Sequence, residues 1–504
     1  MGRLTGLFTL IGMLVACANP PPLVEQPPPW QQMAQADLAF IRDTIAQHHP
    51  GPVDEENPAF RAWFEDGYEQ ALARVGDVRG FGAYQHVLRL YAEGFADEHL
   101  NAFFWLDFRW TPWAGIVLAW NGAEFELRRA ADDVPLPPGA VLVGCDGLGA
   151  EELWQRNVTP FYARAELPAN RFREAHRLLL SNGNPLVDRP VECTFLVEEE
   201  PIDYPLAWRN ISVDGLQREL SAGVPENRAA AIRAFGPRGA WLTLPTFSPS
   251  GEAAAQMHAT LESLEQWRES DFIVVDVRGN SGGSSHWTEA FVRHLMGEAY
   301  YQRLRYELWP RRAGVYIDHR VSAENLEYFE SILPWVREQA GEDSETYRYL
   351  EGLVDGLREA LARGEALYRV RADAEAPAEP VPAEPAFKGR VIFLTDSVCV
   401  SACLNFSDWI LALPRVTHVG QPTSADTSYM EVRSVTLPSN IGTLEFATKA
   451  YRGFRRGAEG WYAPEVPYFG DISDTPRVGD WILETVLSSA AGGGNQAVSK
   501  ANAQ

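Results

Sequence analysis

A short apolar run that ends in a glycine-rich turn constrains the fold of this chain more than any other feature. The stretch reads DFIVVDVRGNSGG, from Asp271 to Gly283, and a helical pattern follows it from Ser284. A strand, Gly239 to Phe247, and a helix that starts at Gly251 precede it. This strand-helix-strand-helix order predicts an α/β core.

A second strand-turn-helix stretch, FLTDSVCVSACLNF, carries a serine at the start of its helix. The strand is Val391 to Leu394, and Cys403, Phe406 and later apolar residues then repeat at helical spacing. Ser401 lies at the predicted helix N-terminus, where free N–H groups and the helix dipole favour negative charge. A serine there is most often a helix cap. Ser401 is therefore either a cap or a nucleophile.

The glycine-rich turn after the first strand is suited to binding an anion through its backbone. Gly282 and Gly283 let the main-chain N–H groups approach a ligand closely. The turn lacks the lysine of a phosphate-binding P-loop and the glycine spacing of a dinucleotide-binding turn. Donation to an acyl oxyanion fits it better. We expect Asp276 and Arg278 to be structural and to hold the turn.

Together, the two stretches resemble the C-terminal-processing and tricorn-type serine peptidases. That family has an Asp-x-Arg-x-Asn-x-Gly-Gly turn and then a Ser-Ala-Ser-Glu-like segment, whose place is taken here by VSAC. The resemblance covers about residues 31–480, apart from residues 300–387, and implies a ClpP/crotonase-like catalytic core. It also implies that Ser401 is the nucleophile and that an oxyanion hole is formed by backbone N–H groups of Gly282 or Gly283 and of Ala402.

One branch of this family removes the serine proton with a lysine placed shortly after the nucleophile. Asp426 occupies that place here, and the chain has only three lysines: Lys388, Lys449 and Lys500. We expect Lys449 to be solvent-exposed. A Ser-Lys dyad is therefore not expected.

The tricorn-like branch uses a histidine held by a glutamate instead. FADEHLNAFF resembles its Asp-x-His segment, which makes His99 the general base, and RRGAEGWYAPEVPYF resembles its late glutamate region, which makes Glu459 the orienting carboxylate. A histidine can take the serine proton and pass it to the leaving amine. The glutamate would fix the histidine tautomer.

Other residues compete for these roles. His286, just after the Gly-Gly turn, is the competing histidine, and Glu465 and Asp426 compete with Glu459. Glu98 stands where the tricorn-like branch has a serine, and a second carboxylate there would weaken His99 as a base at neutral pH.

The N-terminus has the form of an export signal. One basic residue, Arg3, precedes an apolar run that is too short to span a bilayer and ends in LVAC. LVAC resembles the lipobox of bacterial lipoproteins, which implies that Cys17 becomes the lipidated first residue. The alternative is an ordinary signal peptide with an incidental cysteine. The Pro-rich stretch that follows would hold a domain away from a membrane.

Charge and cysteine content bear on partners and compartment. The formal net charge of −24 disfavours nucleic acid as a partner. Beyond Cys17, four cysteines could form disulfides in an oxidising compartment or be buried free thiols: Cys145, Cys193, Cys399 and Cys403. No histidine or carboxylate cluster accompanies them, so no metal site is expected. The serine peptidase chemistry implies no organic cofactor either.

The predicted fold class is α/β, with a ClpP/crotonase-like core, an N-terminal helical domain and a PDZ-like β-rich domain. The PDZ-like prediction comes from VPLPPGAVLVGCDGLGAEELWQRNV, where a strand, a glycine turn and a helix near Ala150 follow one another. The predicted parts are a signal peptide with lipobox (1–17), a Pro-rich linker (18–30), the helical domain (31–102), the PDZ-like domain (103–210), the core (211–299 and 388–489), a charged, helical insertion with a Pro/Ala/Glu linker (300–387) and a disordered tail (490–504).

These features favour a serine peptidase that acts on peptides or unfolded protein segments. We expect it to be lipid-anchored in a bacterial cell envelope, at the outer membrane and facing the periplasm. Two alternatives stay open. Cys403 and Leu404, which replace the family's Ser and Glu, and Glu98 fit a catalytically inactive peptide-binding protein on the same fold. An esterase-type acyl hydrolase would use the same triad chemistry.

Overall fold

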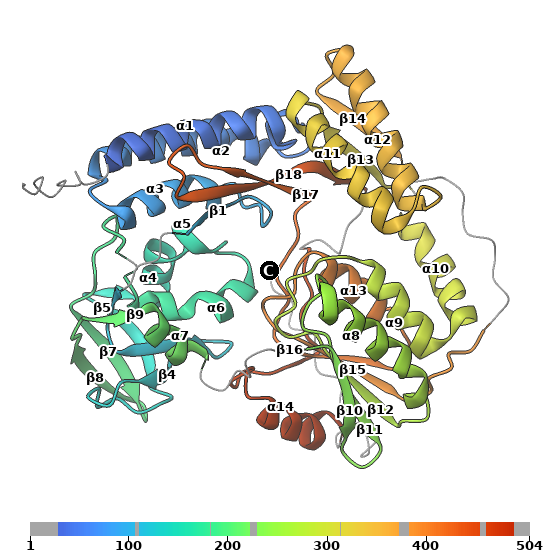
Figure 1. Ribbon diagram of the computed structural model, residues 1–504. Helices are drawn as coiled ribbons and strands as arrows, with labels where there is room; N and C mark the ends of the chain where they lie inside the picture. Colours follow the sequence, from blue (N-terminus) through green and yellow to red (C-terminus); the bar gives the residue numbers. More distant parts are fainter. Residues whose placement is uncertain are drawn as a thin grey trace, which may run out of the picture.

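The computed structural model of the protein describes residues 29–105, 110–181, 183–221, 229–312, 314–371, 383–453 and 460–487. Cys17 with the lipobox, Glu459 and the tail from residue 490 lie outside these ranges. The described residues form helices and several sheets in a mixed α/β arrangement (Figure 1). No helix within the described ranges is long and apolar enough to cross a bilayer.

A six-stranded sheet forms the centre of the α/β core. Its strand order is β10-β11-β12-β15-β16-β19, and every neighbouring pair except β10 and β11 is parallel. The strands are β10 (Ala231–Phe235), β11 (Gly239–Thr243), β12 (Phe272–Asp276), β15 (Arg390–Thr395), β16 (Val416–Gly420) and β19 (Val466–Pro467). The two strands expected from the apolar runs, β12 and β15, lie side by side at its middle.

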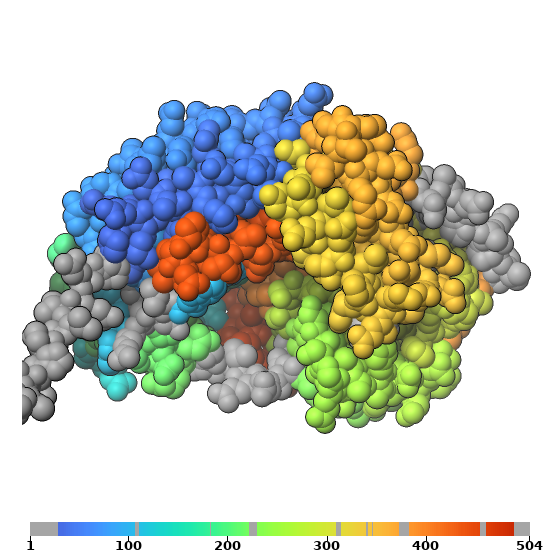
Figure 2. Space-filling model, turned by 45° about the horizontal axis from the view of Figure 1, so that its top comes forward, coloured from blue at the N-terminus to red at the C-terminus, as the bar shows by residue number. Residues whose placement is uncertain are grey.

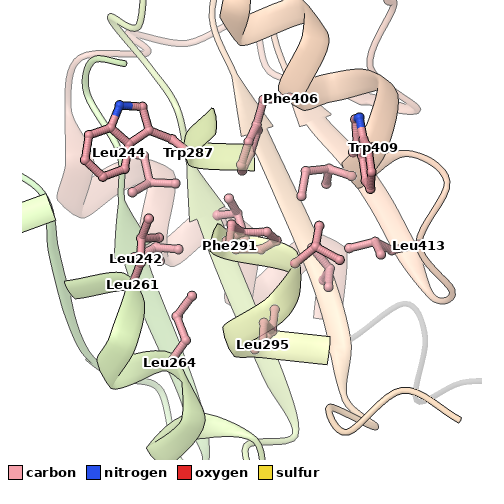
Figure 3. Packing of buried hydrophobic residues seen from close by; sticks show 14 of the residues in the cluster. Leu242, Leu244, Leu261, Leu264, Trp287, Phe291, Leu295, Phe406, Trp409 and Leu413 are labelled. Atoms are coloured by element: carbon pink, nitrogen blue, oxygen red, sulfur yellow. The ribbon is translucent and has the colours of Figure 1, made fainter. Parts of the chain in front are cut away.

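Alternate residues of β12 and β15 point to opposite faces, and helices cover both. Figure 3 shows one face, where Leu242 and Leu244 of the β11 segment pack near Phe291 and Phe406. That face is covered by α8 (Gly251–Glu262), α9 (His286–Met296) and α13 (Ala402–Ile410), and the other by α14 (Thr475–Trp481) and the short π-helix Ile482–Leu487. The apolar runs lack polar alternation because both of their faces are buried.

A separate β-rich domain has its own core. Its sheet has the order β3-β4-β5-β7-β8, with β6 paired to β5. The strands are β3 (Ile116–Trp120), β4 (Phe125–Ala130), β5 (Val141–Cys145), β6 (Leu148–Gly149), β7 (Glu192–Val197) and β8 (Glu200–Pro205). The helices are α4 (Ala150–Asn157), α5 (Thr159–Tyr162) and α6 (Pro168–Glu174). A disulfide joins Cys145 to Cys193 across β5 and β7. The pair β2 (Trp110–Trp113) and β9 (Arg209–Ser212) and helix α7 (Val213–Ser221) complete this part.

Three N-terminal helices pack on a hairpin from the far end of the chain. The helices are α1 (Trp30–His48), α2 (Pro58–Arg74) and α3 (Phe81–Glu93), and the hairpin is β17 (Tyr429–Thr436) with β18 (Gly442–Arg452). Figure 2 shows the hairpin, in red-orange, directly against the blue helices. The predicted core range 388–489 includes this hairpin, but β18 pairs with β1 (Asn101–Phe104), β17 pairs with β18, and neither joins the core sheet.

Residues 298–371 contain strands as well as the expected helices. In chain order, the elements are α10 (Glu298–Arg312), β13 (Tyr316–Arg320), α11 (Ala323–Ala340), α12 (Glu345–Ala362) and β14 (Leu367–Arg371). Strand β13 pairs with β18, so the second large sheet has the order β1-β18-β13-β14, with β17 on β18. The segment is thereby attached to the N-terminal helices as well as to the core.

Candidate active site

Ser401 ends the turn between β15 and α13 in an unusual backbone conformation. Its φ is 58° and its ψ is −122°, which a residue with a Cβ rarely adopts. Such a conformation persists only where the surroundings impose it, and it is common at functional sites. Ser401 is the N-cap residue of α13, but its hydroxyl makes no capping hydrogen bond. The capping role, which the sequence left open, is therefore not the role of this side chain.

The glycine-rich turn after β12 lies directly against this serine. A Cβ on Gly282 would lie 2.9 Å from Ser401 Cβ and 2.8 Å from the Val400 carbonyl oxygen, so only glycine fits there. Its N–H donates to Asn280 Oδ1 at 2.9 Å. Gly283, at φ 130°, pairs with Phe247 in an isolated parallel bridge. The two strand ends thus bring the glycine turn and the serine together.

A buried ion pair holds the glycine turn, as expected for Asp276 and Arg278. Arg278 Nε and Nη2 donate to the two Asp276 oxygens at 2.9 and 2.8 Å. Arg278 also reaches Thr475 Oγ1 at 3.0 Å, at the start of α14. The structural role predicted for both residues is confirmed.

Asp396 connects the glycine turn to the serine turn. Its carboxylate accepts the Gly279 N–H at 2.7 Å and the Val398 N–H at 3.1 Å. Burial raises its pKa to about 6, against the opposing effect of these two N–H groups. Within the serine turn, a disulfide between Cys399 and Cys403 spans Ser401 and ties the turn to α13.

His99 lies in the loop between α3 and β1. Its N–H donates to Asp97 Oδ1 at 3.1 Å, and its ring is half-buried. Nδ1 of the ring is buried and finds no hydrogen-bond partner among the described residues. A buried polar atom of this kind needs a partner, and an orienting carboxylate would supply one.

The serine and histidine segments are connected by two consecutive residues, Asp426 and Thr427. Asp426 Oδ1 accepts the Ser401 N–H at 2.9 Å. Thr427 Oγ1 donates to Asp97 Oδ1 at 2.8 Å, the same oxygen that accepts the His99 N–H. Two regions about 300 residues apart in sequence therefore meet at one place.

The segment that carries the predicted glutamate also leads to this place. Glu459 itself lies outside the described residues, but Gly460 follows it directly. A Cβ on Gly460 would lie 3.0 Å from the Asp426 carbonyl oxygen. Two hydrogen bonds between Thr423 and Tyr462 hold the two segments side by side.

The competing residues have other surroundings. His286 begins α9, where its Nδ1 lies 2.7 Å from Ser284 Oγ, and burial lowers its pKa. Glu465 is exposed, just before β19. The expectation that Lys449 is solvent-exposed is wrong: it is buried on β18, with its Nζ 2.8 Å from Glu431. Lys449 lies in a strand that is covered on both sides, so its aliphatic stem is buried. The local sequence pattern does not show this burial.

Glu98, the departure from the tricorn-like pattern, points toward the β-rich domain. Its carboxylate lies 4.0 Å from the Arg173 guanidinium of α6. Burial raises its pKa, while Arg173 and Arg164 oppose that shift. These arginines offset the negative charge beside His99.

Sequence reasoning missed the residues that join the segments. His49 Nε2 lies 3.0 Å from Asp97 Oδ2, and both side chains are buried. No motif in the sequence marks either His49 or Thr427. Asp426 was noted, because it occupies the position of the lysine in the other branch.

The arrangement brings together a serine at a helix N-terminus, a glycine-rich turn beside it and a segment with a histidine that is connected to it by hydrogen bonds, which are the kinds of group that acyl transfer uses. Across the described ranges, no group of three or more histidine, cysteine, aspartate or glutamate residues is placed to hold a metal ion.

Comparison with known proteins agrees with this geometry. Residues 238–453, which include both turns, match the model of peptidase family S41. No curated protein sequence matches the chain.

Several solved structures are similar to the chain. Mature CPAF complexed with lactacystin has a TM-score of 0.59 and 14% identity, and the alignment covers 92% of this chain and 100% of that one. At this identity the likeness shows a shared fold. The photosystem II D1 C-terminal processing protease has a TM-score of 0.34 and 11% identity, covering 89% of this chain and 96% of that one. The tricorn protease has a TM-score of 0.35 and 12% identity, covering 92% and 37%.

Proposed function

The chain is a serine-type peptidase whose residues 238–453 match the model of family S41, and on that premise we propose that it cuts peptides or unfolded protein segments with Ser401, His99 and Glu459. The observation that carries the proposal is the Ser401 backbone, held at φ 58° and ψ −122° with a hydroxyl that does not cap its helix. The hydroxyl of such a serine lies at the positive end of a helix and is free of the capping role.

The reaction follows from the surroundings of Ser401. Its Oγ attacks the peptide carbonyl carbon while His99 takes the hydroxyl proton. The oxyanion is held by the N–H groups of Gly283 and Ala402, since the Gly282 N–H already donates to Asn280. His99 returns the proton to the leaving amine as the C–N bond breaks. Water then hydrolyses the acyl-enzyme, with His99 again taking a proton.

Glu459 is the carboxylate assigned to orient His99. The buried Nδ1 of His99 needs an acceptor or donor, and Gly460 lies against Asp426 in the same region. A glutamate bonded to Nδ1–H would leave Nε2 unprotonated for the serine and would stabilise the imidazolium.

The β-rich domain is suited to present the substrate. Its helix α6 reaches the site: Leu167 and Ala169 pack against Ala425, next to Asp426. We assign to this PDZ-like domain the binding of an extended peptide as an added strand.

The direct test combines substitution with an active-site label. Ser401→Ala should abolish fluorophosphonate labelling, and both it and His99→Gln should lower peptide turnover about 10⁴-fold or more. Ser428→Ala, an exposed serine close by in the chain, and His286→Gln should stay close to the unmodified protein. Label on the Ser401→Ala variant, or none on the unmodified protein, would exclude Ser401 as the nucleophile. Turnover of esters without peptides would favour an esterase.

We assign the N-terminal segment to a lipid anchor at Cys17, in a bacterial envelope. Its support is the LVAC sequence and the Pro-rich stretch after it. Cys17→Ala, expressed in a bacterial host with metabolic labelling by a fatty acid, should lose the label and leave the membrane fraction. Equal labelling of both proteins would disprove the anchor.

A further inference from the structure

We propose that Asp426 and Thr427 form a positioning strap that fixes Ser401, His99 and the segment beginning at Gly460 relative to one another, an inference that rests on the proposed function. Neither side chain is given a role on the reacting atoms. The strap is the place where these three segments, separated by 59 to about 360 residues, share direct contacts.

The Asp426 side chain acts on the nucleophile. Its Oδ1 accepts the Ser401 N–H at 2.9 Å. A hydrogen bond to a carboxylate is stronger than one between neutral groups, and it fixes the plane of the peptide that enters Ser401. That peptide sets the positive φ of Ser401. With the Ser401 N–H occupied, the next N–H, that of Ala402, is the one left to face an oxyanion.

The Thr427 hydroxyl acts on the base. It donates to Asp97 Oδ1 at 2.8 Å, and the same oxygen accepts the His99 N–H at 3.1 Å. Asp97 is itself fixed, because its Oδ2 lies 3.0 Å from His49 Nε2. The Gly51 N–H donates to His49 Nδ1, which places the His49 proton on Nε2. Asp97 is therefore a buried acceptor with three donors.

This acceptor is charged near neutral pH. Burial alone would raise the pKa of Asp97, but the hydrogen bonds from the His49 ring and from the His99 N–H lower it below its usual range. The Thr427 hydroxyl therefore bonds to a carboxylate, and its loss would leave one bond unmade at a buried charge.

The strap backbone meets the third segment. Gly460, next to Glu459, approaches the Asp426 carbonyl so closely that a Cβ would lie 3.0 Å from it. A shift of the strap would therefore move all three segments, and a small misplacement of reacting groups lowers rate much more than substrate affinity.

The experiment separates positioning from folding. Thr427→Val removes the hydroxyl at nearly constant volume, and Thr427→Ser keeps it. Thr436→Val, an exposed threonine on β17, is the matched control. The measurements are the fluorophosphonate labelling rate, kcat and KM for a fluorogenic peptide, and the thermal midpoint of each variant.

Thr427→Val should lower the labelling rate and kcat about tenfold, the loss expected for one hydrogen bond to a charged group. KM should change less than about threefold, and Thr427→Ser should recover most of the rate. Asp426→Asn, which keeps an acceptor, should retain more labelling than Asp426→Leu. Unchanged kcat and labelling rate in Thr427→Val would refute the strap. An equal loss of kcat and labelling rate in Thr427→Ser and Thr427→Val would also refute it.

The proposed function fails separately from the strap. If Ser401→Ala keeps its label or its turnover, the nucleophile is misassigned, whatever the Thr427 variants do. If the unmodified protein takes no label and cuts no peptide, both proposals are overturned.

Discussion

Asp396, beside the serine turn, makes the free energy of unfolding depend on pH. Burial raises its pKa to about 6 in the folded protein, above its ordinary value of 3.8. The folded state therefore binds this proton more tightly than the unfolded chain does. Its contribution to the free energy of unfolding falls as pH rises from about 4 to about 6, by about 3 kcal/mol in all.

Asp396→Asn removes that titration. Between pH 4 and pH 7, the unfolding free energy of this variant should gain on that of the unmodified protein by up to about 3 kcal/mol. Urea unfolding at the two pH values measures the gain. A constant offset is also expected, because an amide cannot accept both N–H groups. Asp271→Asn, which removes an exposed carboxylate, is the control. The prediction would be contradicted if the unfolding free energies of Asp396→Asn and Asp271→Asn changed with pH in the same way.

The sequence revealed the residues whose chemistry shows in a local pattern. Ser401 and the two glycines could be found because each follows a buried strand and its turn. His49 and Thr427 could not, because their roles come from hydrogen bonds to Asp97, which lies 48 and 330 residues away. A hydroxyl or an imidazole that acts through a distant partner leaves no local signal.

The two disulfides act on elements of different kinds. Cys145 and Cys193 join two strands and close a loop with a sequence separation of 48, whereas Cys399 and Cys403 are separated by 4 and staple the serine turn to α13. Chain entropy assigns about 4 kcal/mol to the long loop and about 2 kcal/mol to the short one. The short one lies beside the nucleophile.

Removing each disulfide should therefore have opposite signatures. Replacing Cys145 and Cys193 by alanine should lower the thermal midpoint more, and leave the fluorophosphonate labelling rate of the remaining folded protein near normal. Replacing Cys399 and Cys403 should cost less stability but slow labelling about tenfold or more, because the Ser401 conformation loses a constraint. Equal labelling rates in both variants would show that the short disulfide does not position the nucleophile.

Strand existence was easier to predict than strand pairing. The apolar runs at β12 and β15 predicted buried strands, and the structure places these side by side at the centre of the sheet. Strand β18 pairs with β1, β13 and β17 and with no strand of the core sheet. Its partners come from three other parts of the chain, and burial against α1–α3 decides the choice. Such pairing depends on tertiary contacts that a local pattern does not contain.

Across the entire protein, one buried arginine joins the parts that carry the site. Arg452 of β18 reaches Asp54 at 2.9 Å, near the N-terminal helices, and Asp318 of β13 at 3.4 Å. All three side chains are at most 5% exposed. Tyr429 Oη also donates to Asp54, at 2.6 Å. Asp54 lies five residues after His49, which holds Asp97, and Tyr429 lies two residues after Thr427 of the strap. The ion network therefore supports the two residues that hydrogen-bond to Asp97.

Arg452→Met should therefore affect stability and catalysis together. It leaves the buried Asp54 carboxylate without its cation, which costs about 3–5 kcal/mol, while Asp318 keeps its ion pair with Arg369. Arg238→Met removes an exposed pair worth about 1 kcal/mol or less. The thermal midpoint should fall by several degrees more in Arg452→Met. At a temperature where both variants are folded, labelling of Ser401 should be slower in Arg452→Met alone, because a looser Asp54 and Tyr429 release His49 and Thr427. If Arg452→Met matched Arg238→Met in both measurements, the N-terminal helices and the second sheet would have to hold the site without this ion network.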